Sequence, residues 1–216
     1  MLSVVKNSVF AGICVAIAAY AYVCTSLFTD PIYGAIIFST ALTYICTRDY
    51  NLYTGKIGKL MPVIKAISYS DEYKRDFIIN LIVMVIINVI TAYIIGLIFG
   101  LMNPSAEAYC ENIFNDKLNL GYPIIFMESV FCGIIFYFAI KCYSKIGVIS
   151  LIMGVVTFIV CGFEHSIANS AYLGISTQLN IPTILVILIS IFGNTVGSVI
   201  VSRFDISIIF APIAQW

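Results

Sequence analysis

Long apolar runs alternate with short polar segments along the whole chain. Each run holds about 20 or more mostly apolar residues, the length that an α-helix needs to cross roughly 30 Å of hydrocarbon. The runs lack the strict alternation of a barrel strand, so the pattern favours helices. The predicted spans are residues 8–27, 31–57, 77–101, 122–143, 146–173 and 182–202. We therefore predict an all-α membrane protein with six transmembrane helices, in a single domain that covers residues 1–216.

Polar residues interrupt two of these spans. The second span is broken around Thr47–Asn51, and the fifth is broken around Gly162–His165. The segments Phe10–Ile13 and Phe131–Ile134, in the first and fourth spans, also resemble each other. Two halves of three spans each then form an inverted repeat with broken second and fifth helices, a pattern that points to a transport site near the membrane midplane.

The remaining polar stretches are expected to be loops, and they are Gly58–Asp76 and Met102–Gly121. A broken helix, in contrast, leaves backbone N–H groups without partners where its second half begins. These groups and the positive end of the helix dipole attract anions. Two such helix starts that meet from opposite halves would form a waist that attracts an anion without holding a fixed positive charge.

The composition agrees with an integral membrane protein. Of the 216 residues, 61% are hydrophobic and 10% are charged, whereas a soluble domain has about 25% charged residues. The formal net charge is zero, which argues against a nucleic-acid partner. The first apolar run continues from Ser8 to Leu27 without a small-residue cleavage site, so we expect no cleaved signal peptide. Because the seven cysteines include no CxxC pair, we interpret them as packing residues and expect no metal and no cofactor.

Lysine and arginine are distributed unevenly between the two sides of the predicted bundle. Basic residues concentrate in cytoplasmic segments. If the N-terminus is inside, the outer side carries only Lys117, and the inner side carries Lys6, Lys56, Lys59, Lys65, Lys74, Arg75, Lys141, Lys145 and Arg203. We therefore predict a multi-pass protein of the plasma or inner membrane with both termini in the cytoplasm.

The only histidine of the chain, His165, lies beside Glu164 inside the fifth span. An ionisable side chain in hydrocarbon is costly unless it has a partner or faces water. Two interpretations follow: the residues form a hydrogen-bonded structural pair, or they form a polar station on the path of a solute. An intramembrane enzyme that uses His165 with Glu164 or Ser166 is a further alternative. Adjacent residues of a helix point about 100° apart, however, which disfavours His165 and Ser166 as base and nucleophile.

Several segments resemble motifs of the formate/nitrite transporter family. The most specific reads Gly162-Phe163-Glu164-His165-Ser166-Ile167-Ala168-Asn169. Others are Asn51-Leu52-Tyr53-Thr54-Gly55, Gly34–Ser39, Glu128 five residues before Gly133, and Gly193–Gly197. The matches occur in the same order as in the family and cover most of the chain.

The resemblance implies an aquaporin-like bundle in which five protomers form a ring and each protomer has its own pore. It implies that Thr54 and His165 form the central polar pair, inside a motif that also contains Glu164 and Asn169. It implies apolar constrictions above and below this pair, formed by Phe38, Leu42, Leu52 and Phe158. Tyr53 stands where the family usually has phenylalanine, and it adds a hydroxyl group to the constriction.

Charged residues near the predicted pore extend the comparison. Lys117 on the outer side and Lys56 on the inner side are candidates for attracting anions into the two vestibules. Arg48 and Asp49 stand where the family usually has small residues. We expect them to pair with each other, and either to face the inner vestibule or to restrain the loop.

The expected function is passive or proton-coupled transport of small monovalent anions or their weak acids, rather than catalysis. An anion that enters an apolar constriction loses water, and its affinity for a proton rises. It would then take a proton from water or through His165, cross as the neutral acid and release the proton on the other side. Formate, nitrite and hydrosulfide are compact enough, as are acetate and lactate as further candidates. The predicted partners are these solutes, protons, the lipid bilayer and four further copies of the chain.

Overall fold

The structure, a computed structural model, describes residues 1–204, and these residues form helices and no strand. Residues 205–216, the end of the predicted domain and the predicted cytoplasmic C-terminus, lie outside the described part. The helices are α1 (Leu2–Ser26), α2 (Pro31–Thr47), α3 (Tyr53–Lys56), η1 (Ile57–Lys59), α4 (Leu60–Lys65), α5 (Asp71–Met102), α6 (Pro104–Leu120), α7 (Tyr122–Ile146), α8 (Val148–Val160), α9 (Ser166–Ser176) and α10 (Ile181–Phe204).

The apolar helices are of two kinds, long and short. Four of the described helices are long and apolar enough to cross a membrane by length and composition, and they are α1, α5, α7 and α10. The helices α2 and α8 are apolar but shorter, with 17 and 13 residues. Each of them ends at a short non-helical segment, after which a further helix begins. The described chain is therefore an all-helical protein with several apolar helices, two of which are short and are followed by a break.

The prediction that residues 102–121 form a loop is wrong, because residues 104–120 form the helix α6. The side chain of Asn103 caps this helix by accepting hydrogen bonds from the N–H groups of Ser105 and Ala106. Pro104 occupies the first turn, where its missing N–H costs nothing. At the other end, Gly121 has a φ of 85°, which glycine adopts without strain. Cys110, expected in this loop, is fully buried in the helix.

The other predicted loop, Gly58–Asp76, is also shorter than expected. η1 and α4 extend to Lys65, and α5 begins at Asp71. The hydroxyl group of Ser70 caps α5 by accepting a hydrogen bond from the N–H group of Tyr73. The first turn of α5 is charged, and for that reason it was predicted as part of the loop, although acidic residues favour a helix N-terminus.

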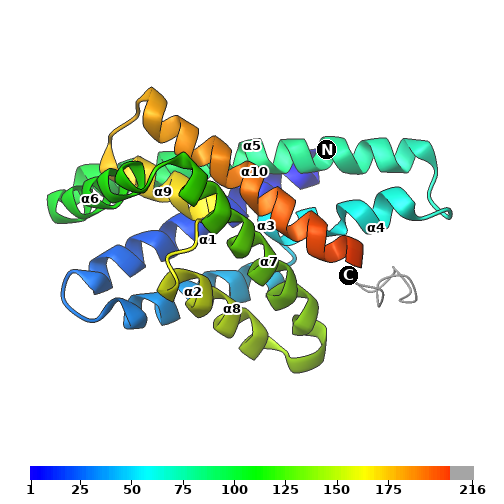
Figure 1. Cartoon of the computed structure of the whole chain (residues 1–216), viewed down its shortest axis with the longest axis horizontal. Helices are drawn as coiled ribbons and strands as arrows, with labels where there is room; N and C mark the ends of the chain where they lie inside the picture. The colour runs from blue at the N-terminus through cyan, green and yellow to red at the C-terminus, as the bar shows by residue number, and fades with distance from the viewer. Residues whose placement is uncertain (205–216) are drawn as a thin grey trace.

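Figure 1 shows how the helix ends are distributed along the long axis of the molecule. The start of α1, the turn between α4 and α5, and the end of α10 lie towards one end. The turn between α1 and α2, α6, and the start of α10 lie towards the other end. Of the basic residues named above for the inner side, Lys6, Lys65, Lys74, Arg75 and Arg203 lie at or next to the first group of helix ends. Lys141 and Lys145 lie near the end of α7, Lys56 and Lys59 lie on α3 and η1, and Lys117 lies on α6.

Glycine allows the tightest helix contacts. A Cβ atom on Gly197 of α10 would overlap the carbonyl oxygen of Val130 in α7, and one on Gly174 of α9 would overlap that of Tyr93 in α5. Close approach of backbones through small residues is the usual source of helix association in membranes. The pair α5–α9 thereby holds the short helix α9 against a long helix, and the pair α7–α10 joins two long helices.

We expect Gly197→Ala to destabilise the fold, because the new methyl group would push α10 away from α7. Overpacking of this kind costs roughly 1–3 kcal/mol. Gly55→Ala is the matched control, since its Cβ would meet only the flexible end of Ile140 at 3.6 Å. Thermal unfolding in detergent should show a clear loss for Gly197→Ala and little change for Gly55→Ala. Equal melting temperatures for the two variants would contradict this account of the helix contact.

Candidate functional site

Two non-helical segments bring distant parts of the chain together. After α2, the residue Asp49 adopts a left-handed conformation with φ 50°, and after α8 the residue Gly162 does the same with φ 72°. In both segments the next residue donates its N–H group back into the preceding helix: Tyr50 to the carbonyl of Ile45 at 2.9 Å, and Phe163 to that of Phe158 at 2.8 Å. Helix then resumes three residues later in each case, at Tyr53 and Ser166.

Thr54 and His165 meet where these two helices begin. The Oγ1 atom of Thr54 lies 2.9 Å from the Nε2 atom of His165, although the residues are 111 positions apart. Both side chains are almost completely buried. The structure thus places in direct contact the two residues that were predicted to form the central pair.

Hydrogen bonds fix the proton position on the neutral His165 ring. The N–H group of Ala168 donates to Nδ1 at 3.1 Å, so Nδ1 must carry a lone pair. In the neutral imidazole the proton then lies on Nε2, which donates it to the Thr54 oxygen. The hydroxyl hydrogen of Thr54 is consequently available to a third group, and the centre presents a hydrogen-bond donor to any solute that reaches it.

Two aromatic rings pack against the imidazole and against each other, with 5.9 Å between the centroids of Phe136 and Phe158. Phe136 stacks on His165 with 4.8 Å between ring centroids, and Phe158 stacks at 5.5 Å. Phe38 meets Phe158 edge to face at 6.2 Å. The sequence analysis did not select Phe136. Its position three residues after Gly133, on the same face of α7, is the signal that could have identified it.

The predicted constriction residues do not all lie together. Phe38, Leu42, Leu52 and Phe158 are buried in one hydrophobic cluster. Tyr53 belongs to a second cluster with Ile57, Leu81 and Met84, and its hydroxyl group lies 2.7 Å from the Thr195 Oγ1 atom. The tyrosine hydroxyl is therefore satisfied between helices, and the structure does not bring Tyr53 to the other four residues.

Glu164 is the centre of a buried polar network. One of its carboxylate oxygens forms an ion pair with Lys117, and the other accepts a hydrogen bond from the amide of Asn169. The Asn169 amide also donates to Ser190 at 3.1 Å. Glu164 is nearly inaccessible and the Lys117 side chain is 14% exposed. Lys117 is thus a paired cation, not the free vestibule charge that the sequence suggested.

The basic residues at the first break also have partners. Lys56 forms an ion pair with Asp49 at 2.6 Å, and the guanidinium of Arg48 lies over the ring of Tyr44. The expected pairing of Arg48 with Asp49 is therefore wrong. Adjacent residues at a left-handed position point apart, whereas Lys56 reaches Asp49 from the first turn of the next helix.

Glu128 adds an acid that the sequence analysis did not place in the site. Its Oε2 atom is buried without a hydrogen-bond partner among the described residues. Its electrostatic neighbours are Glu164 and Lys117. An ionisable residue inside a predicted span was the signal that could have marked it.

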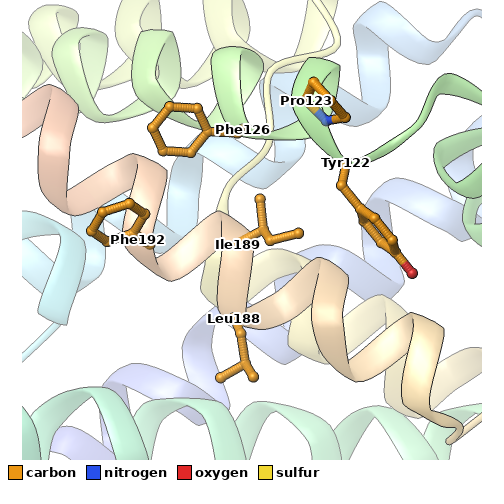
Figure 2. A pocket seen from close by; sticks show the side chains of 6 residues that line it. All are labelled: Tyr122, Pro123, Phe126, Leu188, Ile189 and Phe192. Carbon is orange, nitrogen blue, oxygen red and sulfur yellow. The ribbon is translucent and has the colours of Figure 1, made fainter.

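A separate cleft lies between α7 and α10, with a volume of about 440 Å³. Figure 2 shows the side chains that line it, and all of them are apolar or aromatic: Tyr122, Pro123, Phe126, Leu188, Ile189 and Phe192. No predicted site residue lines this cleft. Within residues 1–204, no group of three or more histidine, cysteine, aspartate or glutamate residues could hold a metal ion.

His165 and Glu164 are not arranged as an acid–base pair for Ser166. Both ring nitrogens of His165 are engaged by Thr54 and Ala168, and both carboxylate oxygens of Glu164 are engaged by Lys117 and Asn169. The hydroxyl oxygen of Ser166 has no partner in the described structure. Neither His165 nor Glu164 is placed to activate the Ser166 hydroxyl group as a nucleophile, which the enzyme alternative requires.

Comparison with known proteins shows the family and the fold. The family described as formate/nitrite transporter matches residues 1–204. A solved structure titled "FNT family ion channel" superposes with a TM-score of 0.84 at 18% identity, covering 98% of this chain and 91% of that chain. A "Pentameric formate channel with formate bound" superposes with a TM-score of 0.78 at 18% identity, covering 96% of each chain. No curated protein matches the sequence.

We expect Lys117→Met to destabilise the protein strongly, because it leaves the Glu164 carboxylate buried without its cation. Breaking one side of a buried ion pair costs roughly 3–5 kcal/mol. The double variant Lys117→Met, Glu164→Gln should recover most of that loss, since no buried charge is left. A double-mutant cycle by thermal unfolding in detergent measures the coupling. Additive effects of the two single substitutions would show that the pair does not act as a unit.

Proposed function

Since this chain belongs to the formate/nitrite transporter family, we propose that it carries small monovalent anions or their conjugate acids across the membrane. The observation that carries the proposal is the buried contact between Thr54 and His165, at the point where the starts of two interrupted helices meet. The family and the two similar structures are transporters and channels, which supports transport rather than catalysis.

We propose that the whole of residues 1–216 is one transporter domain with six membrane crossings. The second crossing would combine α2 with α3, η1 and α4, and the fifth would combine α8 with α9, so that each is a broken helix. The similarity to channel structures over nearly the full chain supports this assignment. The basic residues at one end of the bundle favour both termini in the cytoplasm and a place in the plasma or inner membrane.

The assembled state in this proposal is a homopentamer with one pore in each protomer. It rests on the fold shared with a neighbour that is described as a pentameric formate channel. The exposed apolar side chains of α5 and α10 suit either lipid or a neighbouring protomer.

The proposed path passes an apolar constriction that is formed by Phe38, Leu42, Leu52 and Phe158. Phe136, which packs against Phe158, also belongs to this constriction. Such a constriction excludes hydrated ions, because sodium and chloride would lose their water without compensation. At its centre, the Thr54 hydroxyl offers a hydrogen bond to a dehydrated anion. Lys117 and Lys56 would attract anions only locally, since each is paired with a carboxylate.

The hydrogen bonds also bear on the source of the transported proton. A neutral His165 that gave up its Nε2 proton would become an imidazolate anion in an apolar site, which is very unfavourable. It could give a proton only after Nδ1 had been protonated, and that would break the bond from Ala168. We therefore favour water as the proton donor and His165 as the group that orients Thr54 towards the anion. The substrate would be as compact as formate, nitrite or hydrosulfide, with acetate and lactate as larger candidates.

We expect His165→Phe to fold, because a phenyl ring can keep the stacking with Phe136 and Phe158, but to lose proton-coupled uptake of weak acids. His165→Asn can keep a hydrogen bond to Thr54 without a titratable ring, so it should retain proton-coupled uptake if water donates the proton; a current of the ionised form would show instead that the ring supplies it. Thr54→Val should lower uptake at least as much as His165→Phe, since it removes the hydroxyl group that contacts the anion. Uptake into liposomes against pH, together with current at fixed voltage, measures all three variants.

Tyr53→Phe is the control for these variants, because its hydroxyl group bonds to Thr195 outside the central pair. It should keep the wild-type pH profile. If His165→Phe transported at the wild-type rate and with the wild-type pH dependence, His165 would be a packing residue and the proposed mechanism would be refuted. Stopped-flow uptake of formate, nitrite, hydrosulfide, acetate and lactate by the wild type would identify the substrate.

The proposed topology predicts opposite labelling of two exposed positions. Asn119 lies on α6 and Ser68 lies in the turn between α4 and α5. In a cysteine-free background, Asn119→Cys should react with an impermeant thiol reagent in intact cells, and Ser68→Cys only after permeabilisation. The reverse pattern would place both termini outside.

A further inference from the structure

Asn194 of α10 holds the segment that carries His165. This residue is completely buried. Its Oδ1 atom accepts a hydrogen bond from the N–H group of Ser166 at 2.9 Å. Its amide nitrogen donates to the carbonyl of Glu164 at 2.8 Å and to the carbonyl of Ser129 in α7 at 2.9 Å. One side chain thus grips the backbone on both sides of His165 and ties it to α7.

Asn88 of α5 makes the same set of bonds at the first break. It is also completely buried. Its Oδ1 atom accepts from the N–H group of Tyr53 at 2.8 Å. Its amide nitrogen donates to the carbonyl of Asn51 at 3.0 Å and to the carbonyl of Ser8 in α1 at 2.7 Å. This side chain grips the backbone on both sides of Leu52 and ties it to α1.

The two clamps, defined as Asn88 and Asn194 with their three bonds each, occupy equivalent places in the two halves. Ser8 and Ser129 each stand four residues before a glycine, Gly12 or Gly133, whose missing Cβ leaves room for the backbone oxygen of the clamp asparagine. The left-handed residues Asp49 and Gly162 each precede the gripped position by three residues. Leu52 and His165 are therefore equivalent positions, one apolar and one titratable.

Only asparagine satisfies this arrangement. It offers one acceptor and two donors, and all three are used within the protein. Aspartate has no donor and would place a charge against two carbonyl oxygens. Each lost bond would leave a buried backbone group without a partner. Because the amide hydrogens are occupied, neither asparagine can bind a solute without releasing its clamp, so any effect on transport acts through the gripped residue.

We propose that Asn88 and Asn194 are positioning residues with separate tasks. Asn194 orients the ring of His165, and Asn88 holds Leu52 in the position where its side chain helps to exclude hydrated ions. The inference rests on the proposed transport function. The titratable groups around His165 are Glu164 within the gripped segment, Lys117 from α6, Glu128 and Cys132 from α7, and Tyr172 from α9. The one charged residue of α10 is Arg203 in its last turn.

The experiment compares Asn194→Asp and Asn88→Asp, with Ser198→Ala as control. Ser198 of α10 is buried and its hydroxyl group donates to the carbonyl of Gly133, so the control removes a buried hydrogen bond without touching either break. His165 is the only histidine. Protein that is labelled with ¹⁵N-histidine and purified through a histidine-free tag therefore gives ring nitrogen signals from His165 alone. This readout does not depend on transport.

In the wild type, the nitrogen signals should report a proton on Nε2 and a hydrogen-bonded lone pair on Nδ1. Asn194→Asp should change these signals, alter the pH profile of weak-acid uptake and lower its rate by about tenfold to a hundredfold, as for a misplaced active group. Asn88→Asp should leave the histidine signals and the pH profile unchanged but admit chloride into liposomes. Ser198→Ala should do neither.

The inference is overturned if both aspartate variants resemble Ser198→Ala, or if Asn88→Asp changes the histidine signals as much as Asn194→Asp does. Asn194→Ser and Asn88→Ser, which keep one donor, serve if the aspartate variants do not fold. If no substitution at a position folds, that asparagine is a folding requirement, and the proposal is rejected there. Wild-type protein that takes up none of the five weak acids would instead refute the proposed function, while the histidine signals would still decide whether Asn194 orients His165.

Discussion

An interrupted helix in a membrane protein must find partners for its backbone groups, because hydrocarbon offers none. This chain meets that constraint twice with the same solution. A left-handed residue turns the chain, an N–H group reaches back into the preceding helix, and a buried asparagine from a neighbouring long helix pairs with the groups on both sides of the break. The later residues of each break are therefore buried and held by hydrogen bonds, and the glycine contacts that bring α7 against α10 and α5 against α9 hold the supporting helices in place.

A break held in this way gives His165 one environment. Its ring packs against both Phe136 and Phe158, and its two nitrogens are assigned to Ala168 and Thr54. The centre then offers a donor but no free cation, since Lys117 and Lys56 are both paired with carboxylates. A site of this kind can stabilise an anion briefly without trapping it, which suits rapid passage more than tight binding.

The apolar runs, the positions of both breaks and the contact of Thr54 with His165 could be predicted, because each rests on a local pattern or on the eight-residue motif around His165. The helix α6 was missed because its composition is polar, although Asn103, Pro104 and Gly121 carry its cap signals. Long-range partners were not predictable: Lys117 and Glu164 are 47 positions apart, and no periodicity relates them. The direction of Tyr53 was also missed, since adjacent residues at a helix start face different clusters and the sequence does not say which.

The equivalence of Leu52 and His165 shows how a symmetric scaffold can serve an asymmetric task. Each is held by the same three hydrogen bonds, so the backbone of the two halves is matched while the side chains are not. With leucine at both positions Thr54 would lose the partner that orients its hydroxyl group, and little would compensate an anion for its lost water. With histidine at both it would hold two ionisable rings in hydrocarbon, at a high cost. With one of each, the proposed passage is apolar except for a single polar contact, the arrangement that the proposed transport of a dehydrating weak acid requires.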